Sequence, residues 1–172
     1  MSLDPVISLT LSWGLALLFA GSALHKLRGW GGFVEALAGY RLLPPPLVTP
    51  LAACLWLAES ATAAGLALRE TAAAAVAAAL LASYALAMAV NLWRGRRLLD
   101  CGCGGTPQPV SWMLVARNGM LVIASLAALI PAGERPLGWL DGFTALAAVA
   151  AIAAVYGAID ALGAARARLE AA

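Results

Sequence analysis

The stretch VISLTLSWGLALLFAGSAL, residues 6–24, contains 19 consecutive residues without an acidic or basic side chain. As a helix it would be about 28 Å long, close to the roughly 30 Å hydrocarbon core of a bilayer. The whole chain has the same character: 63% of its 172 residues are apolar and 12% are charged, whereas soluble domains carry about 25% charged residues. With so few polar residues to face water, the chain is predicted to be an all-α polytopic membrane helix bundle.

Further apolar runs follow, each bounded by charged residues, glycines or prolines. With the first run they predict five spans, at residues 6–24, 47–68, 71–93, 112–130 and 142–159, in a single membrane domain covering residues 1–172. Between the first two spans, apolar and charged side chains alternate at helical spacing over residues 33–43. This pattern predicts a short interfacial amphipathic helix there, ended by the three prolines that follow.

The basic residues predict the orientation of the bundle, because cytoplasmic loops of membrane proteins carry an excess of Lys and Arg. Eight of them lie on the side where the first, third and fifth predicted spans end: Lys26, Arg28, Arg41, Arg94, Arg96, Arg97, Arg166 and Arg168. The opposite side has only Arg69 and Arg135. The side with eight is therefore predicted to be cytoplasmic, with the N-terminus outside and the C-terminus inside. The basic residues are few, and all except Arg117 lie near span ends, which indicates the lipid bilayer as a partner and no nucleic acid.

Two cysteines lie one residue apart in the turn DCGCGG, residues 100–105, between the third and fourth predicted spans. The intervening glycine permits the strained backbone that a disulfide between such close cysteines needs, and strained, exposed disulfides are the labile, catalytic kind. Nearby Arg96 and Arg97 favour thiolates, although the preceding aspartate opposes them. Cys101 and Cys103 are therefore predicted to be the catalytic residues of a thiol–disulfide exchange, at the cytoplasmic face of the bundle.

Other interpretations of this turn remain open. Two thiolates also suit a soft metal such as Cu(I), Hg(II) or Zn, so Cys101 and Cys103 could instead be the ligands of a metal-binding or transport protein. Only two ligands are local, however, and no His-rich or Cys-rich tract lies nearby. In a third interpretation the thiols are incidental and the chain is a non-enzymatic maturation factor. The sequence therefore leaves open whether the protein is an enzyme.

Several polar residues lie inside predicted spans, where they normally face the bundle interior. Glu59 and Arg117 could form a structural ion pair if a helix tilts or the arginine extends, and proton transfer by Glu59 is the alternative. Asn91 and Asn118 are predicted to hydrogen-bond between helices. Cys54 is interpreted as a small packing residue or, if the thiol turn enters the bundle, as a third thiol.

No cofactor is evident from the sequence. His25 is the only histidine, so one chain cannot provide two axial histidines for a haem. It is interpreted as an interface residue, with a role as a base near the thiols as the alternative. A quinone could carry electrons, but no sequence motif marks a quinone site.

The order of these motifs resembles the MauE family, methylamine utilisation membrane proteins related to DoxX. The resemblance rests on these segments: Phe19-Ala20-Gly21 through His25-Lys26-Leu27, Phe33 through Pro44, Leu57-Ala58-Glu59, Asn91 through Arg96, Asp100 through Gly104, Ser111-Trp112 and Arg117-Asn118. It implies a DoxX-like four-helix core followed by a fifth, C-terminal span.

The resemblance also implies a function in protein maturation. Members of the family are thought to assist the maturation of an exported disulfide-rich protein, the small subunit of methylamine dehydrogenase, beside a thioredoxin-like partner, MauD. Cys101 and Cys103 would then exchange electrons with such a partner. A periplasmic client and a cytoplasmic thiol turn require that electrons cross the bundle, through Cys54 or a quinone, or that the orientation is reversed.

Overall fold

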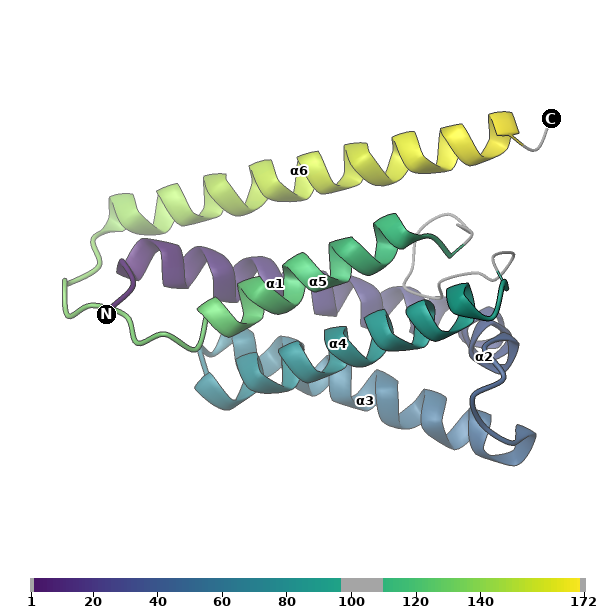
Figure 1. Ribbon diagram of the computed structural model, residues 1–172. Helices are drawn as coiled ribbons and strands as arrows, with labels where there is room; N and C mark the ends of the chain where they lie inside the picture. Colours follow the sequence, from purple (N-terminus) through teal and green to yellow (C-terminus); the bar gives the residue numbers. More distant parts are fainter. Residues whose placement is uncertain (1, 97–109, 171–172) are drawn as a thin grey trace.

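The computed structural model is an all-helical bundle (Figure 1). It describes residues 2–96 and 110–170, with the side chains of the last helix given up to residue 159 and for 161 and 162. The elements in order are α1 (Pro5–Arg28), α2 (Trp30–Gly39), a 3₁₀ turn η1 (Pro45–Leu47), α3 (Val48–Ala67), α4 (Thr71–Trp93), α5 (Trp112–Ala127) and α6 (Trp139–Glu170). Among the described residues, four helices (α1, α3 with its preceding turn, α4 and α6) are long and apolar enough to cross a membrane. The predicted fold class is confirmed.

Several helix boundaries differ from the prediction: α1 and α6 extend beyond the spans predicted at 6–24 and 142–159. The fourth predicted span, 112–130, corresponds to the 16-residue helix α5, because the chain tightens into turns after Ala127 and reaches Pro131. The interfacial helix predicted at 33–43 begins at Trp30 and ends at Gly39. The Gly29 amide donates to the His25 carbonyl and ends α1. The Gly29 carbonyl then accepts from the Phe33 amide, so α2 starts at once and includes Gly31 and Gly32.

The connection between α3 and α4 is a tight turn that places the two helices side by side. Arg69 adopts a left-handed conformation (φ 62°). The Glu70 amide donates to the Gly65 carbonyl at 2.8 Å, and the Arg69 amide donates to the Leu66 carbonyl at 3.0 Å. This pair of bonds is a Schellman motif, which satisfies the last carbonyls of α3 and reverses the chain. A Cβ atom at Gly65 would lie only 2.7 Å from the Cβ of Ala73 on α4.

Gly65→Leu should therefore destabilise the bundle by about 1–3 kcal/mol, the usual cost of overpacking a close contact. A matched control is Gly157→Leu on α6, where an added Cβ meets nothing within 4 Å. We expect the melting temperature in detergent to fall for Gly65→Leu and to stay near the wild-type value for Gly157→Leu. Equal melting temperatures for the two variants would contradict the close approach of α3 and α4.

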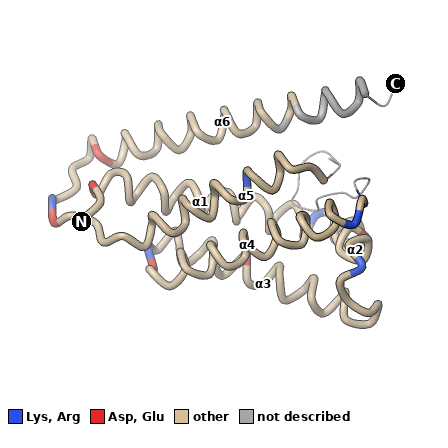
Figure 2. The backbone as a smooth tube through the Cα atoms, in the orientation of Figure 1, with Lys and Arg blue, Asp and Glu red and all other residues tan. Residues whose placement is uncertain are grey.

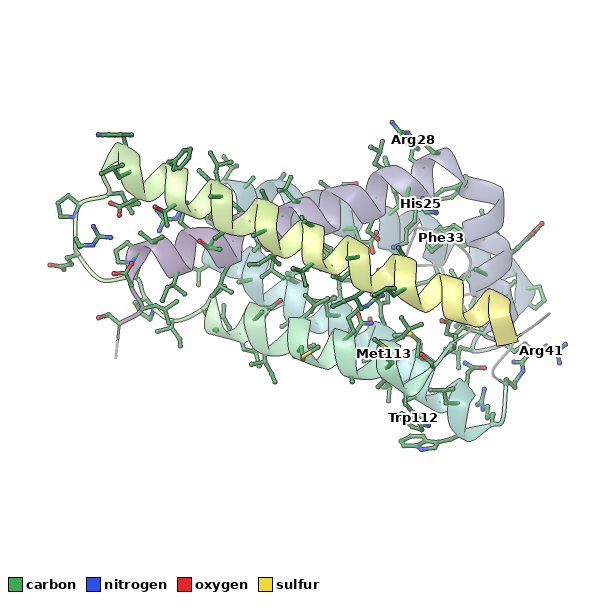
Figure 3. The ribbon with its side chains drawn as sticks, turned by 90° about the horizontal axis from the view of Figure 1, so that it is seen from above. His25, Arg28, Phe33, Arg41, Trp112 and Met113 are labelled. Atoms are coloured by element: carbon green, nitrogen blue, oxygen red, sulfur yellow. The ribbon has the colours of Figure 1, made fainter. Side chains whose placement is uncertain are left out.

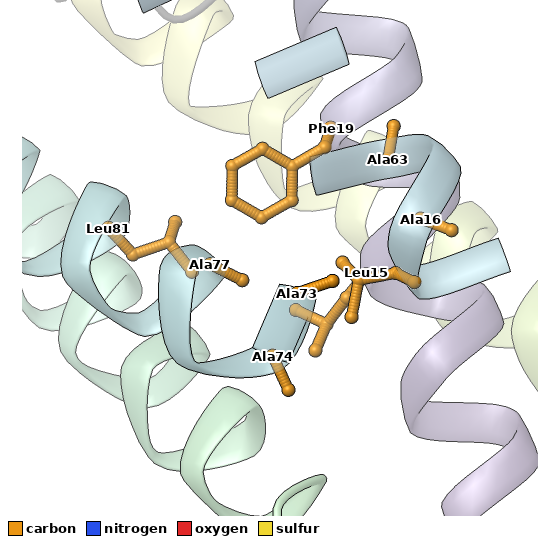
Figure 4. Close-up of a cluster of buried hydrophobic side chains, with 9 residues drawn as sticks. Leu15, Ala16, Phe19, Ala63, Ala73, Ala74, Ala77 and Leu81 are labelled. Carbon is orange, nitrogen blue, oxygen red and sulfur yellow. The ribbon is translucent and has the colours of Figure 1, made fainter. Parts of the chain in front are cut away.

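Small side chains let α1, α3 and α4 pack closely at the centre of the bundle. The buried cluster that joins them is shown in Figure 4 and consists of Leu15, Ala16, Phe19, Ala63, Leu66, Ala73, Ala74, Ala77 and Leu81. Phe19 is the largest of these side chains and is 1% exposed. Helix α5 packs along α4, whereas α6 packs chiefly on α1 along the outside of the bundle (Figure 1).

The two ends of the bundle differ in charge (Figure 2). At the end with the N-terminus, the Arg135 guanidinium donates to both carboxylate oxygens of Asp141 at 2.9 and 3.1 Å and lies 3.7 Å from Asp4. Arg69 is likewise followed directly by Glu70. The other end, where α1 and α4 finish and α2 lies, carries Arg28, Arg41, Arg94 and Arg96 against Glu35. The surplus of positive charge is thus at the end reached by α1 and α4.

Candidate functional site

Glu59 forms a buried ion pair with Lys26. The carboxylate lies in the middle of α3 and is 1% exposed, while the ammonium group lies in the last turn of α1 and is 3% exposed. An ionised side chain inside a membrane bundle is costly unless an opposite charge compensates it. The sequence offers Arg117 as a possible partner of Glu59 and counts Lys26 among the basic residues of the cytoplasmic flank; in the structure Lys26 is the partner of Glu59.

Side chains from three further positions complete this polar core. Ser22, one turn before Lys26 on α1, accepts from the Lys26 Nζ at 3.0 Å and donates to both Glu59 oxygens at 3.3 Å. The Tyr84 hydroxyl of α4 donates to Glu59 Oε1 at 2.8 Å. The Lys26 Nζ also lies 5.1 Å from the ring centroid of Phe33 on α2 and 5.2 Å from that of Tyr84, distances typical of cation–π contacts.

The polar core joins four helices at one point. A second bond reinforces the contact between α1 and α3, since the Trp56 indole N–H donates to the Ala23 carbonyl at 3.2 Å. Because each side chain of the core contacts at least one other, the arrangement fixes the end of α1 relative to the middle of α3 and of α4. The polar core can therefore hold the charged end of the bundle in place. Glu59 could exchange a proton only if its ion pair with Lys26 opens.

Arg117 lies in a different environment from the one predicted. Its guanidinium carbon is 5.2 Å from the ring centroid of Tyr156 on α6. Arg117, Tyr156, Glu59 and Tyr84 all line one cavity of about 630 Å³ between α1, α5 and α6. Arg117 and Glu59 thus face the same space, but the ion pair is made by Lys26.

A family model described as Methylamine utilisation protein MauE matches residues 4–131. A protein named Methylamine utilization protein MauE from Paracoccus denitrificans is 41% identical over 156 residues, covering 84% of each chain. A protein of the same name from Paracoccus versutus is 43% identical over 171 residues, covering 96% of this chain and 91% of the relative. The chain belongs to the MauE family. The resemblance noted in the sequence is confirmed.

The MauE family match covers α1 to α5, and the alignment with the Paracoccus versutus MauE extends over nearly the whole chain, α6 included. No solved structure shows a significant match to the chain.

Within this MauE-family chain, the predicted catalytic residues Cys101 and Cys103 lie outside the described residues, as does Arg97. The residues on either side are described and sit at the same end of the bundle. Arg96 follows Gly95 in a second Schellman motif, with its amide donating to the Asn91 carbonyl at 2.9 Å, and its guanidinium lies 3.4 Å from the Asn91 side-chain oxygen.

The chain is anchored again at Val110. This side chain is 2% exposed and packs with four others from α4, α5 and the end of α2: Tyr40, Met88, Leu92 and Leu114. Ser111 then caps α5, its Oγ accepting from the Leu114 amide at 3.4 Å. Figure 3 shows that the start of α5, marked by Trp112, lies at the same end of the bundle as His25 and Phe33. Both ends of the thiol-bearing segment are thus fixed at the positively charged end.

The remaining predicted residues are placed as follows. Cys54 lies five residues before Glu59 on α3, about 140° around the helix, and is exposed on the bundle surface rather than in the polar core. Asn91 and Asn118 are buried, but each side-chain amide donates to a carbonyl one turn earlier in its own helix, at 3.1 and 3.0 Å. These described bonds lie within helices, not between helices as predicted. His25 is exposed near the end of α1 and lines the cavity.

Sequence reasoning missed Lys26, Ser22 and Tyr84 as members of the polar core. One signal was available: Ser22 and Lys26 are four residues apart, so they share a helix face if the first helix continues past Leu24. That continuation does occur, because α1 runs to Arg28. No local signal marked Tyr84, which reaches Glu59 only through the packing of α4 on α3.

Proposed function

We propose that this chain is a membrane thiol–disulfide factor of methylamine utilisation. Cys101 and Cys103 would exchange electrons with a thioredoxin-like, MauD-like partner and so assist disulfide formation in an exported client such as the methylamine dehydrogenase small subunit. The observation that carries the proposal is that the Cys-Gly-Cys turn falls inside the region matched by the MauE family model, residues 4–131. Its two flanks are fixed at one end of a bundle tied together by a buried ion pair.

The exchange balances as follows. A thiolate of the reduced pair attacks a disulfide sulfur of the partner and forms a mixed disulfide, and the second thiolate displaces the partner's thiol. The pair is oxidised to a disulfide while the partner is reduced to a dithiol, so two electrons move and no other reactant is consumed. The same steps in reverse oxidise the partner.

We propose that the positively charged end, and with it the thiol turn, is cytoplasmic, so that electrons from an exported client would cross the bundle to reach the thiols. The buried position of Lys26 removes it from the count of loop residues, which leaves seven basic residues on that side against Arg69 and Arg135 on the other. The excess remains in the direction that the positive-inside rule associates with the cytoplasm.

Side-specific alkylation tests both the redox state and the side. In a Cys54→Ser background, Cys101 and Cys103 are the only thiols that this chain offers to a maleimide. A membrane-impermeant maleimide added to intact cells then reports whether they face the outside. We expect no labelling from outside and two labels after the membrane is opened. A mild disulfide oxidant should remove both labels, and a reductant should restore them.

Three outcomes would contradict parts of this proposal. Labelling from outside after reduction would reverse the orientation. Labels that never change with oxidant would exclude the disulfide. Thiols that react only after a metal chelator is added, and not after a reductant, would support the soft-metal alternative.

A further inference from the structure

The cavity between α1, α5 and α6 has the shape of an amphiphile site. Its α1 wall runs from Thr10 to Arg28, a length of about 27 Å along the helix. Toward the Thr10 end of the cavity, the described lining residues are almost all apolar, for example Leu11, Ala124 and Val149. Its polar lining residues gather toward the other end, near the polar core. A long apolar trough with one polar end fits a molecule with an isoprenoid tail and a polar head.

The cavity lies among helices of the membrane bundle. Helix α6 packs on α1 rather than against α5. The membrane-spanning part of α6 is only 11% buried. A ligand would therefore enter from the membrane between α5 and α6.

The polar end favours a head that accepts hydrogen bonds. Glu59 is the only described carboxylate in the lining, and Lys26 compensates its charge, while the basic side chains Arg28 and His25 line the same end. The N–H donors there include those of Arg117, which lies five residues into α5, about 8 Å below the start of that helix. A phosphate would have to lose its hydration to reach that depth, whereas carbonyl oxygens would not carry a charge there.

We propose that this cavity binds a membrane quinone, with the ring at the Arg117 end and the tail along α1. The inference rests on the proposed function for its chemistry: a quinone would be the final oxidant of the Cys101–Cys103 pair. In that reaction two thiols lose two electrons and two protons and form one S–S bond, and the quinone takes up both electrons and both protons to become a quinol.

Binding of decyl-ubiquinone to the purified protein in nanodiscs made of neutral phospholipid tests the site. Gly21 lines the cavity, and an added Cβ there meets nothing within 4 Å, so Gly21→Phe should fill the space without a backbone clash. Gly157→Phe on α6 is the matched control, since it also has open space and does not line the cavity. We expect saturable binding of one quinone per chain, weakened at least tenfold by Gly21→Phe and unchanged by Gly157→Phe, with both variants keeping the wild-type melting temperature.

Further measurements distinguish a failure of the quinone site from a failure of the proposed thiol–disulfide function. The Cys101→Ser/Cys103→Ser variant should bind the quinone as the wild type does, because the cavity is not made by the thiols. Saturable binding with thiols that never oxidise would keep the site and overturn the proposed function. Thiols that cycle with a thioredoxin-like partner, without quinone binding, would overturn the site. Equal quinone binding by Gly21→Phe would also overturn it. So would retention of an anionic phospholipid that quinone cannot displace.

Discussion

Replacing Lys26 by Met should lower the free energy of unfolding by about 3–5 kcal/mol, the usual cost of leaving one partner of a buried ion pair unpaired. The effect should be large because Glu59 is 1% exposed and cannot reach water to recover its solvation. Unfolding in mixed detergent micelles, followed by circular dichroism, measures the change. Arg28→Met is a matched control two residues later on α1, where the side chain is exposed. It should change the stability by about 0.5 kcal/mol or less.

The double variant Lys26→Met/Glu59→Gln should recover most of that loss. The amide oxygen of a glutamine still accepts the hydrogen bond that Tyr84 donates to Glu59 Oε1, and no buried charge remains. We expect the double variant to lie within about 1 kcal/mol of the wild type, since buried ion pairs often contribute little net stability compared with neutral groups. A double variant no more stable than Lys26→Met would show that the two residues are not coupled.

Replacing either Cys101 or Cys103 by Ser should abolish the proposed function rather than reduce it. A single thiol can form a mixed disulfide but cannot complete a two-electron exchange. Expression of each variant in a Paracoccus denitrificans strain that lacks its own MauE, grown with methylamine as the nitrogen source, measures this. We expect wild-type growth to be restored by the wild-type chain and not by either variant.

Cys54→Ser is the matched control for that experiment. Cys54 is exposed on the surface of α3 and takes no part in the polar core, so its loss should leave growth unchanged. Loss of growth with Cys54→Ser would instead support its alternative role as a third thiol. Full growth with a Cys101→Ser/Cys103→Ser chain would mean that the thiols are dispensable.

The sequence predicts the class of fold well, because apolar composition and span length are properties of whole segments. It predicts less well where a span ends. The sequence predicts that the first span ends at Leu24, because His25, Lys26 and Arg28 follow, yet α1 continues to Arg28 and buries Lys26. A basic residue at the end of an apolar run can face water or turn inward, and hydropathy does not distinguish the two. The choice depends on whether a carboxylate on another helix lies at the same depth.

The same limit applies to the candidate site. Glu59 was recognised because an acidic residue in the middle of an apolar run is unusual. Arg117 is the possible partner that the sequence offers, since both residues lie inside predicted spans. In the structure Arg117 instead lies over the Tyr156 ring and faces the cavity. Which cation reaches Glu59 is decided by the packing of α1 on α3, a contact that no sequence period encodes.

Trapping of a mixed disulfide tests the central claim, that the two cysteines exchange electrons with a thioredoxin-like partner, most directly. Cys101→Ser and Cys103→Ser chains, each in a Cys54→Ser background, would be incubated with a MauD-like partner that keeps only its attacking cysteine and carries it as an activated mixed disulfide. We predict that one of the two variants forms a covalent adduct with the partner that a reductant dissolves, and that the chain without cysteines forms none. Folded single-cysteine chains that both fail to form the adduct would contradict the account.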